Sequence, residues 1–281
     1  MVTRAVTGYT GLILDLTGNG FQAHHCTATQ ARQASASRVP MPFAVSIRPG
    51  EMLRVLCLAD SWPFHFHIAR MSKLPKTEKL SIAGPAGRLE ALLESPRDGE
   101  AAASAVICHP HPEHGGTMQN KVVHTLARAF VARGFAALRF NFRGVGESEG
   151  TFDGGEGEVQ DALAAVHTMK ERMGDAKLWL AGFSFGAAIA IHAAAAARPG
   201  GLVSVAPAVS RVSKQMGPQP DCPWLIIQGD EDEVVAVSDT IAWVNELEPG
   251  PELQIFEGTG HFFHGKLVKL RHAVEAFIDA H

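Results

Sequence analysis

The chain has 281 residues, of which 46% are hydrophobic and 19% are charged, and its formal net charge is −4. This composition is typical of a globular protein and excludes the disordered and collagen-like classes, while the mildly acidic balance gives no electrostatic signature of nucleic-acid binding. The sequence contains no run of about 18 apolar residues and no evident secretory leader, so neither a membrane span nor secretion is predicted.

Residues 1–70 differ in charge from the rest of the chain. They carry six arginines, three acidic residues and no lysine, whereas all nine lysines stand at or beyond Lys73. Met71 also resembles a natural start. We interpret residues 1–70 as an N-terminal extension outside the main folded domain, either an over-extended start or a disordered or targeting segment. A separate small domain is the third alternative, but two apolar patches, at 11–16 and 52–59, are too few to form a hydrophobic core.

From about Lys76, short apolar strands alternate with longer helical stretches. This alternation predicts an α/β domain over residues 71–281, built on a mostly parallel sheet. Strands are predicted at 78–83, 88–95, 104–110, 135–141, 177–183, 202–207, 223–229 and 252–258, of which the first two form a hairpin. Helices are predicted at 120–133, 156–173, 185–198, 237–247 and 266–280.

The strongest chemical motif is the run Gly-Phe-Ser-Phe-Gly at 182–186. It has the form G-x-S-x-G, with a strand before it and a helix after it, which is the context that a nucleophile elbow requires. The glycines leave room for a tight turn that exposes the hydroxyl of Ser184. A chance Gly-Ser-Gly turn is the alternative, but the strand and the helix around the motif favour a nucleophile.

A serine nucleophile needs a base, and the base needs an acid that orients it. The elbow predicts the chain order Ser, Asp or Glu, His. Asp230 and Asp232 follow the strand at 223–229, and Asp232 is preferred because it lies further along the loop and is free to reach inward. His261 and His264 follow the last strand. His261 is preferred because it comes after a flexible Gly-Thr-Gly run, while His264 is expected to start the final helix.

The loop after the strand at 104–110 is expected to complete an oxyanion hole. Its run is His-Pro-His-Pro, and because prolines have no N–H, the backbone amide of His111 is the donor that this turn can offer. The second donor is the backbone amide of Phe185, at the start of the helix that follows Ser184.

A zinc site is the rival interpretation of this loop. His109, His111, Glu113 and His114 resemble the H-x-H-x-D-H run of the metallo-β-lactamase-like hydrolases, and closely spaced histidines can hold zinc. Two prolines interrupt the run, glutamate replaces the expected aspartate, and such a fold has no need of the G-x-S-x-G elbow. We therefore expect no metal and no other cofactor.

The Gly-rich run at 139–148 could be misread as a dinucleotide-binding loop. It lacks the G-x-G-x-x-G spacing, and no helix starts immediately after it. We expect this segment to shape the rim of the site, with Asn141 or Arg143 holding neighbouring loops by hydrogen bonds.

Taken together, these segments resemble the α/β-hydrolase superfamily, and in particular its compact lid-less bacterial branch near the dienelactone-hydrolase-like proteins and small esterases. The segments that carry the resemblance are 109–130, 134–158, 180–190, 226–235 and 258–267. The resemblance implies an α/β-hydrolase fold with helices on both faces of the sheet, a triad of Ser184, Asp232 and His261, and oxyanion donors at His111 and Phe185. Dienelactone hydrolases proper use a cysteine nucleophile, so Ser184 argues against that activity.

The function expected from these features is serine hydrolysis of a small carboxylic ester or thioester through an acyl-enzyme. Only residues 208–222 separate two of the predicted strands where many relatives insert a lid, so an open site is expected. A non-catalytic hydrolase scaffold is the alternative from another class. The four cysteines, Cys26, Cys57, Cys108 and Cys222, are far apart and are expected to be reduced in a cytoplasmic protein. The sequence predicts no particular oligomeric state.

Overall fold

The computed structural model describes residues 11–17, 20–26, 43–46, 54–57, 75–212 and 218–281, and the chain divides into two compact units, Met1–Met71 and Ser72–His281. The first unit contains two antiparallel strand pairs. They are formed by β1 (Gly11–Thr17), β2 (Gly20–Cys26), β3 (Phe43–Ser46) and β4 (Arg54–Cys57). The interpretation of residues 1–70 as an extension outside the catalytic domain stays a prediction.

The second unit is built on an eight-stranded sheet with the strand order β12-β11-β10-β9-β7-β8-β6-β5. Its strands are β5 (Lys76–Gly84), β6 (Gly87–Ser95), β7 (Ala103–Cys108), β8 (Phe135–Phe140), β9 (Lys177–Phe183), β10 (Gly201–Val205), β11 (Trp224–Gly229) and β12 (Glu252–Phe256). β6 pairs antiparallel with β5 and with β8, and every other pairing in this sheet is parallel. The predicted α/β architecture with a mostly parallel sheet and an opening hairpin is therefore confirmed.

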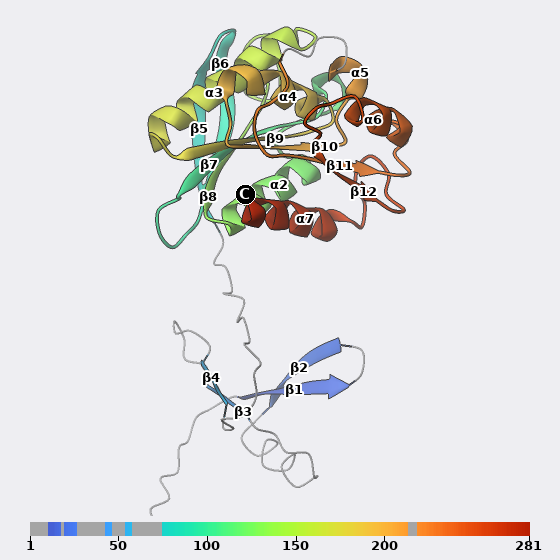
Figure 1. The fold of residues 1–281 in the computed structure, drawn as a ribbon. Coiled ribbons are helices and arrows are strands. Elements are labelled where there is room, and N and C mark those ends of the chain that lie inside the picture. The colour runs from blue at the N-terminus through green and yellow to red at the C-terminus, as the bar shows by residue number, and fades with distance from the viewer. Residues whose placement is uncertain (1–10, 18–19, 27–42, 47–53, 58–74, 213–217) are drawn as a thin grey trace, which may run out of the picture. The chain divides into compact units, whose positions relative to one another are not determined.

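Helices cover both faces of this sheet, as Figure 1 shows. α3 and α4 lie on one face with α5 and α6, and α2 and α7 lie side by side on the other. The helices are α2 (Lys121–Ala132), α3 (Glu156–Met173), α4 (Phe185–Ala197), α5 (Val209–Val212), α6 (Val237–Val244) and α7 (Leu267–Ala280), and a 3₁₀ turn, η1, spans Pro112–His114. Within the described residues, no helix is both long enough and apolar enough to cross a membrane.

Two hydrophobic cores form because successive side chains of a strand point to opposite faces of the sheet. In β9, Leu178 and Leu180 join the core under α3 and α4, whereas Trp179 and Ala181 join the core under α2 and α7. Since both faces are covered, the central strands are buried over nearly their whole length and consist mostly of apolar residues. The same burial fixes the register of β9, and with it the position of the turn that follows.

The predicted helices differ from the structure at a few ends. α7 begins at Leu267, so His264 does not start it as expected: Gly265 adopts a left-handed conformation, with φ of 71°, that interrupts a helix. α6 ends at Val244, because the N–H of Leu247 bonds to the carbonyl of Val244, three residues back, instead of continuing the helical pattern. The turns η1 and α5 were not predicted, since three or four residues are too few to show a period.

Candidate active site

Ser184 lies on a sharp turn between β9 and α4. Its backbone has φ of 56° and ψ of −118°, a conformation that side-chain-bearing residues rarely adopt. The N–H of Ser184 donates to the carbonyl of Val205 at 2.9 Å, which ties the turn to the end of β10. The turn therefore holds the serine in a strained conformation at the carboxyl edge of the parallel strands, where α/β sheets place their ligands.

The two glycines of the motif are required by close backbone approach. A Cβ at Gly182 would lie 2.2 Å from the carbonyl oxygen of Gly186, and a Cβ at Gly186 would lie 2.3 Å from the carbonyl oxygen of His109. Neither position can accept a side chain without moving the backbone. The sequence reasoning that glycines make room for the turn is confirmed, and Gly186 also lets α4 start against the loop after β7.

The structure brings Ser184, His261 and Asp232 together from three separate loops. Nε2 of His261 lies 3.0 Å from Oγ of Ser184, and Nδ1 of His261 lies 2.8 Å from Oδ2 of Asp232. All three residues are buried or nearly so. Because an ionised carboxylate can only accept, Nδ1 carries the proton and Nε2 is left to accept from the serine hydroxyl. This is the tautomer that a general base for Ser184 requires.

Asp232 is held as a carboxylate by four hydrogen-bond donors. Its Oδ1 accepts from the N–H groups of Val234 and Val235, both at 2.8 Å, and its Oδ2 accepts from Nε2 of Gln228 at 2.8 Å as well as from His261. Burial works to raise the pKa of Asp232, but the bonds from His261, Val235 and Val234 outweigh it, so the pKa lies below its ordinary value. The acid is therefore ionised at neutral pH.

The loops that carry Asp232 and His261 are joined by further bonds. Oδ1 of Asp230 accepts from the N–H of Thr259 at 3.2 Å, and Oε2 of Glu233 accepts from the N–H of His261 at 3.1 Å. Asp230, the competing candidate for the acid, thus bonds to the backbone of the histidine loop and not to the His261 ring. His264, the competing base, lies in the turn before α7, where its ring contacts Phe262.

The backbone N–H groups of His111 and Phe185, the two predicted oxyanion donors, are free to donate a hydrogen bond. Within the described part of the chain, neither backbone N–H donates a hydrogen bond to another group. Phe185 opens α4, whose N-terminal end adds a partial positive charge. The side chains of the two residues also meet, since their ring centroids are 5.0 Å apart. The two predicted donors therefore lie on neighbouring segments beside Ser184.

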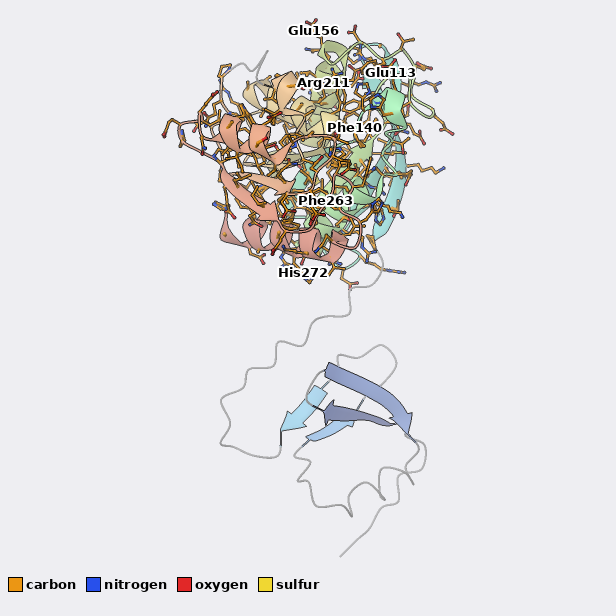
Figure 2. All side chains as sticks on the ribbon, turned by 90° about the vertical axis from the view of Figure 1, so that its right-hand side faces the viewer. Glu113, Phe140, Glu156, Arg211, Phe263 and His272 are labelled. Carbon is orange, nitrogen blue, oxygen red and sulfur yellow. The ribbon has the colours of Figure 1, made fainter. Side chains whose placement is uncertain are left out.

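An arginine that sequence reasoning missed contacts both of these residues. Nη2 of Arg211, on α5, donates to Nε2 of His111 at 3.0 Å, Nη1 donates to the carbonyl of Gly154 at 3.0 Å, and the guanidinium lies 5.1 Å from the ring centroid of Phe185. Figure 2 shows Arg211 on the side of the sheet away from His272 of α7. Burial, Arg211 and His114 lower the pKa of His111, against a smaller opposing effect of Glu113. The His111 ring is thus held neutral.

The first histidine of the loop has a structural role. His109 is fully buried, its Nδ1 bonds to the carbonyl of Pro110 at 2.7 Å, and its Nε2 accepts from the N–H of Phe142 at 3.0 Å. Both ring nitrogens are engaged within the protein, so His109 offers no lone pair to a metal. Nε2 of His111 accepts from Arg211, while its buried Nδ1 has no hydrogen-bond partner. The described residues contain no group of histidine, cysteine and acidic side chains arranged to hold a metal ion. The engaged nitrogens of His109 argue against the rival zinc site, and the expectation of no metal stays a prediction.

The rim loop after β8 is held as the sequence predicted. Oδ1 of Asn141 accepts from the N–H of Met118 at 2.8 Å, and Nδ2 of Asn141 donates to Glu90 at 2.7 Å. Arg143 forms a buried two-pronged ion pair with Asp161 of α3, at 2.9 and 2.8 Å. Both residues join neighbouring segments, and the loop that they hold supplies Gly154 as an acceptor for Arg211.

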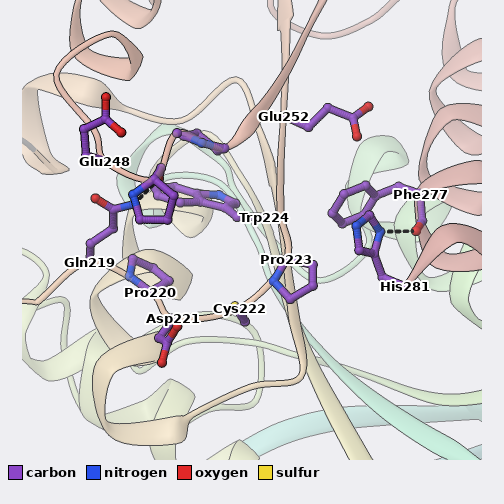
Figure 3. Close-up of a pocket in the computed structure, with 13 residues that line it drawn as sticks. Gln219, Pro220, Asp221, Cys222, Pro223, Trp224, Glu248, Glu252, Phe277 and His281 are labelled. Carbon is purple, nitrogen blue, oxygen red and sulfur yellow. Dashed lines mark hydrogen bonds between the residues drawn. The ribbon is translucent and has the colours of Figure 1, made fainter.

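A separate pocket of about 610 Å³ lies away from Ser184 (Figure 3). It is lined by residues at the N-terminal ends of β11 and β12, among them Trp224 and Glu252, and by Phe277 and His281 of the C-terminal segment. In this parallel sheet the catalytic candidates follow the opposite, carboxyl ends of the strands. The pocket contains none of them, and nothing in its lining points to the same chemistry.

The chain is similar to a hydrolase family model and to solved structures of α/β serine hydrolases. A family model described as serine aminopeptidase, S33, matches residues 99–221. An uncharacterised protein of Rickettsia prowazekii is 37% identical in an alignment 210 residues long, which covers 69% of this chain and 86% of that protein.

Solved structures extend this likeness. A protein of Xanthomonas campestris, described as an α/β serine hydrolase without a lid, is 40% identical, with a TM-score of 0.70 over 73% of this chain and 94% of its own. An α/β serine hydrolase homologue of Coxiella burnetii is 44% identical, with a TM-score of 0.68 over 71% of this chain and 96% of its own.

Proposed function

This chain belongs to the lid-less α/β serine hydrolases, and on that premise we propose that it cleaves carboxylic ester or thioester bonds through an acyl-enzyme formed on Ser184. The observation that carries the proposal is the unbroken hydrogen-bonded chain from Ser184 through His261 to Asp232, with contacts of 3.0 and 2.8 Å. A serine hydroxyl is a weak nucleophile, and a neutral imidazole at this distance removes its proton as the bond to carbon forms.

Each residue has a distinct part in the proposed reaction. The oxygen of Ser184 attacks the carbonyl carbon while Nε2 of His261 takes the hydroxyl proton, and Asp232 stabilises the imidazolium that results. The developing oxyanion lies between the amides of His111 and Phe185. His261 then gives the proton to the leaving oxygen or sulfur, and a water molecule, activated by the same base, releases the acid and frees Ser184.

The acyl-enzyme is expected to be open to water and to substrates of modest size. α5 is the one described element between β10 and β11, and it has four residues. The substrate of the proposed reaction is a small acyl ester or thioester. A peptide bond uses the same machinery, and the matched family description makes it the main competing substrate. A cytoplasmic location stays a prediction.

The proposal is tested by labelling and by turnover. Wild-type protein is expected to react with a fluorophosphonate probe and to hydrolyse short p-nitrophenyl esters or acyl thioesters, whereas Ser184→Ala loses labelling and on the order of 10⁶-fold in kcat. Ser238→Ala, which removes an exposed serine on α6, is the matched control and keeps both activities.

Three outcomes would overturn the proposal in different ways. Turnover of aminoacyl p-nitroanilides but not of esters would assign peptide bonds. Absence of labelling in the wild-type protein would indicate a non-catalytic scaffold. Loss of activity with a chelator would show that a metal is required.

A further inference from the structure

Two adjacent phenylalanines after the predicted base have opposite environments. The side chain of Phe262 is 46% exposed, whereas that of Phe263 is fully buried. Five large hydrophobic side chains are exposed among the described residues, and Phe262 is the one aromatic ring in that set. An exposed aromatic ring beside a reactive centre presents a large apolar surface that a ligand can cover.

The backbone fixes this arrangement. Phe263 has φ of 53°, in the left-handed region that side-chain-bearing residues avoid. Its ring packs 5.9 Å from that of Phe256 in the core, and its N–H donates to the carbonyl of Gly260 at 3.1 Å. Figure 2 shows Phe263 inside the domain. Burial of Phe263 therefore holds a strained turn, and that turn leaves Phe262 on the outside.

Phe262 lies against the imidazole of the proposed base. Its ring centroid is 5.2 Å from that of His261, with the two planes at 86°, and 6.3 Å from that of Phe183. The Nε2 edge of the same imidazole faces Ser184 at 3.0 Å. A group bound next to Nε2 of His261 is therefore within reach of the exposed Phe262 ring.

The reaction chemistry determines which part of a substrate lies next to Nε2 of His261. In the tetrahedral intermediate, the oxyanion must face the amides of His111 and Phe185, and the leaving oxygen or sulfur must face Nε2 of His261, which gives it a proton as the carbonyl carbon–heteroatom bond breaks. The acyl chain takes the remaining direction. The leaving alcohol or thiol, and not the acyl chain, is thus the part that passes beside His261.

We propose that Phe262 is a specificity-determining residue that binds an aromatic or similarly bulky apolar group on the leaving alcohol or thiol. This inference rests on the proposed function, because it requires His261 to protonate the leaving group. The competing role for Phe262 is to shield the bond between His261 and Asp232 from water. A shield acts on every substrate alike, whereas a leaving-group contact acts only on substrates that carry the bulky group.

The test compares two acetate esters, benzyl acetate and ethyl acetate. Both alcohols are of similar acidity, and both esters give the same acetyl-enzyme, so any difference between them arises in the acylation step that kcat/KM reports. Phe262→Ala is expected to lower kcat/KM for benzyl acetate about tenfold and to change that for ethyl acetate less than twofold. Phe262→Leu, which keeps apolar volume without a ring, is expected to lie in between. Ile255→Ala removes a comparably exposed apolar side chain from β12 and serves as the control.

The outcomes separate this inference from the proposed function. Equal losses for both esters, or no loss for either, would overturn the role of Phe262 while leaving the esterase intact. If wild-type protein hydrolyses neither ester and resists the fluorophosphonate probe, the proposed function fails, and the inference fails with it. Should Phe262→Ala not fold, Phe262→Leu alone decides, since a ring contact requires a selective loss for benzyl acetate.

Discussion

The backbone N–H of Phe142 donates a 3.0 Å hydrogen bond to Nε2 of His109, and this bond joins the loop after β7 to the loop after β8. Nδ1 of His109 donates to the carbonyl of Pro110, while Nε2 accepts from Phe142. Only a neutral imidazole has one nitrogen that donates and one that accepts, so the ring makes both bonds only while it is uncharged. The loop that presents the His111 amide is therefore held by a histidine that must stay uncharged.

This histidine predicts a dependence of stability on pH. Burial lowers the pKa of His109 from 6.5 to about 4. Between those values the unfolded chain binds more protons than the folded protein does. The contribution of neutral His109 to the free energy of unfolding is therefore complete above pH 6.5. It falls by about 3 kcal/mol as the pH falls toward 4. The free energy of unfolding, measured with urea from pH 4 to 7, should depend less on pH in His109→Gln than in the wild-type protein. Equal slopes would contradict the assignment.

Asp232 and Asp230 can be distinguished by single substitutions. Asp232→Asn is expected to lower kcat about 10⁴-fold, because an amide that donates to Nδ1 of His261 stabilises the wrong tautomer. Asp230→Asn weakens only the bond to the backbone of Thr259 and should cost less than tenfold. Ester hydrolysis by the two purified variants checks this, and comparable losses in both would remove Asp232 from its proposed role.

The close approach at the nucleophile turn predicts a large effect of one methyl group. Gly186→Ala places a Cβ 2.3 Å from the carbonyl oxygen of His109 and should leave little soluble folded protein. Gly250→Ala is the matched control, since the nearest atom to its Cβ is the carbonyl oxygen of Leu247 at 3.6 Å. Thermal unfolding and soluble yield measure both. A folded Gly186→Ala protein with an unchanged melting temperature would show that the backbone there can move.

Arg211 is expected to support the oxyanion donors without touching the reacting atoms. Arg211→Met removes the bonds to His111 and Gly154 and should lower kcat about tenfold with little change in KM, while Arg211→Lys, which keeps one donor, should recover part of the loss. Arg172→Met, which breaks an exposed ion pair with Glu78, is the control. A change confined to KM would instead indicate that Arg211 binds substrate.

Residues 71–281 are predicted to suffice for catalysis. A chain that begins at Met71 should be soluble and keep the full kcat and KM for esters, because the proposed triad of Ser184, Asp232 and His261 and both proposed oxyanion donors lie in the second compact unit. Gel filtration and ester turnover of the shortened and full-length chains check this. Aggregation or loss of turnover on shortening would show that residues 1–70 are a functional part of the protein.

Much of the fold could be predicted because its signals are local. The apolar runs at β7, β9 and β11 are buried on both sides, and their boundaries follow from Gly and Pro residues that interrupt them. The G-x-S-x-G motif then located Ser184, and chain order placed Asp232 and His261 on the loops that the structure brings to it.

The rest of the site depends on contacts that no local pattern encodes. Arg211 stands on a four-residue helix and meets His111, which is 100 positions away in the chain. Phe262 and Phe263 are identical in type, and only the left-handed backbone of Phe263 decides which ring is exposed. The acidic run after β11 indicated an acid, but not that Glu233 would bond to the backbone of His261.

The bonds between the two loops that carry Asp232 and His261 make them one cooperative unit. The carboxylates of Asp230 and Glu233 accept from the N–H groups of Thr259 and His261, and the N–H of Glu231 donates to the carbonyl of Thr259. Neither loop can open without releasing the other, so the amide hydrogens of Thr259 and His261 should exchange with deuterated water with the same free energy of opening. Partial unfolding would then disconnect acid and base in a single event, and no state with a half-assembled pair would accumulate.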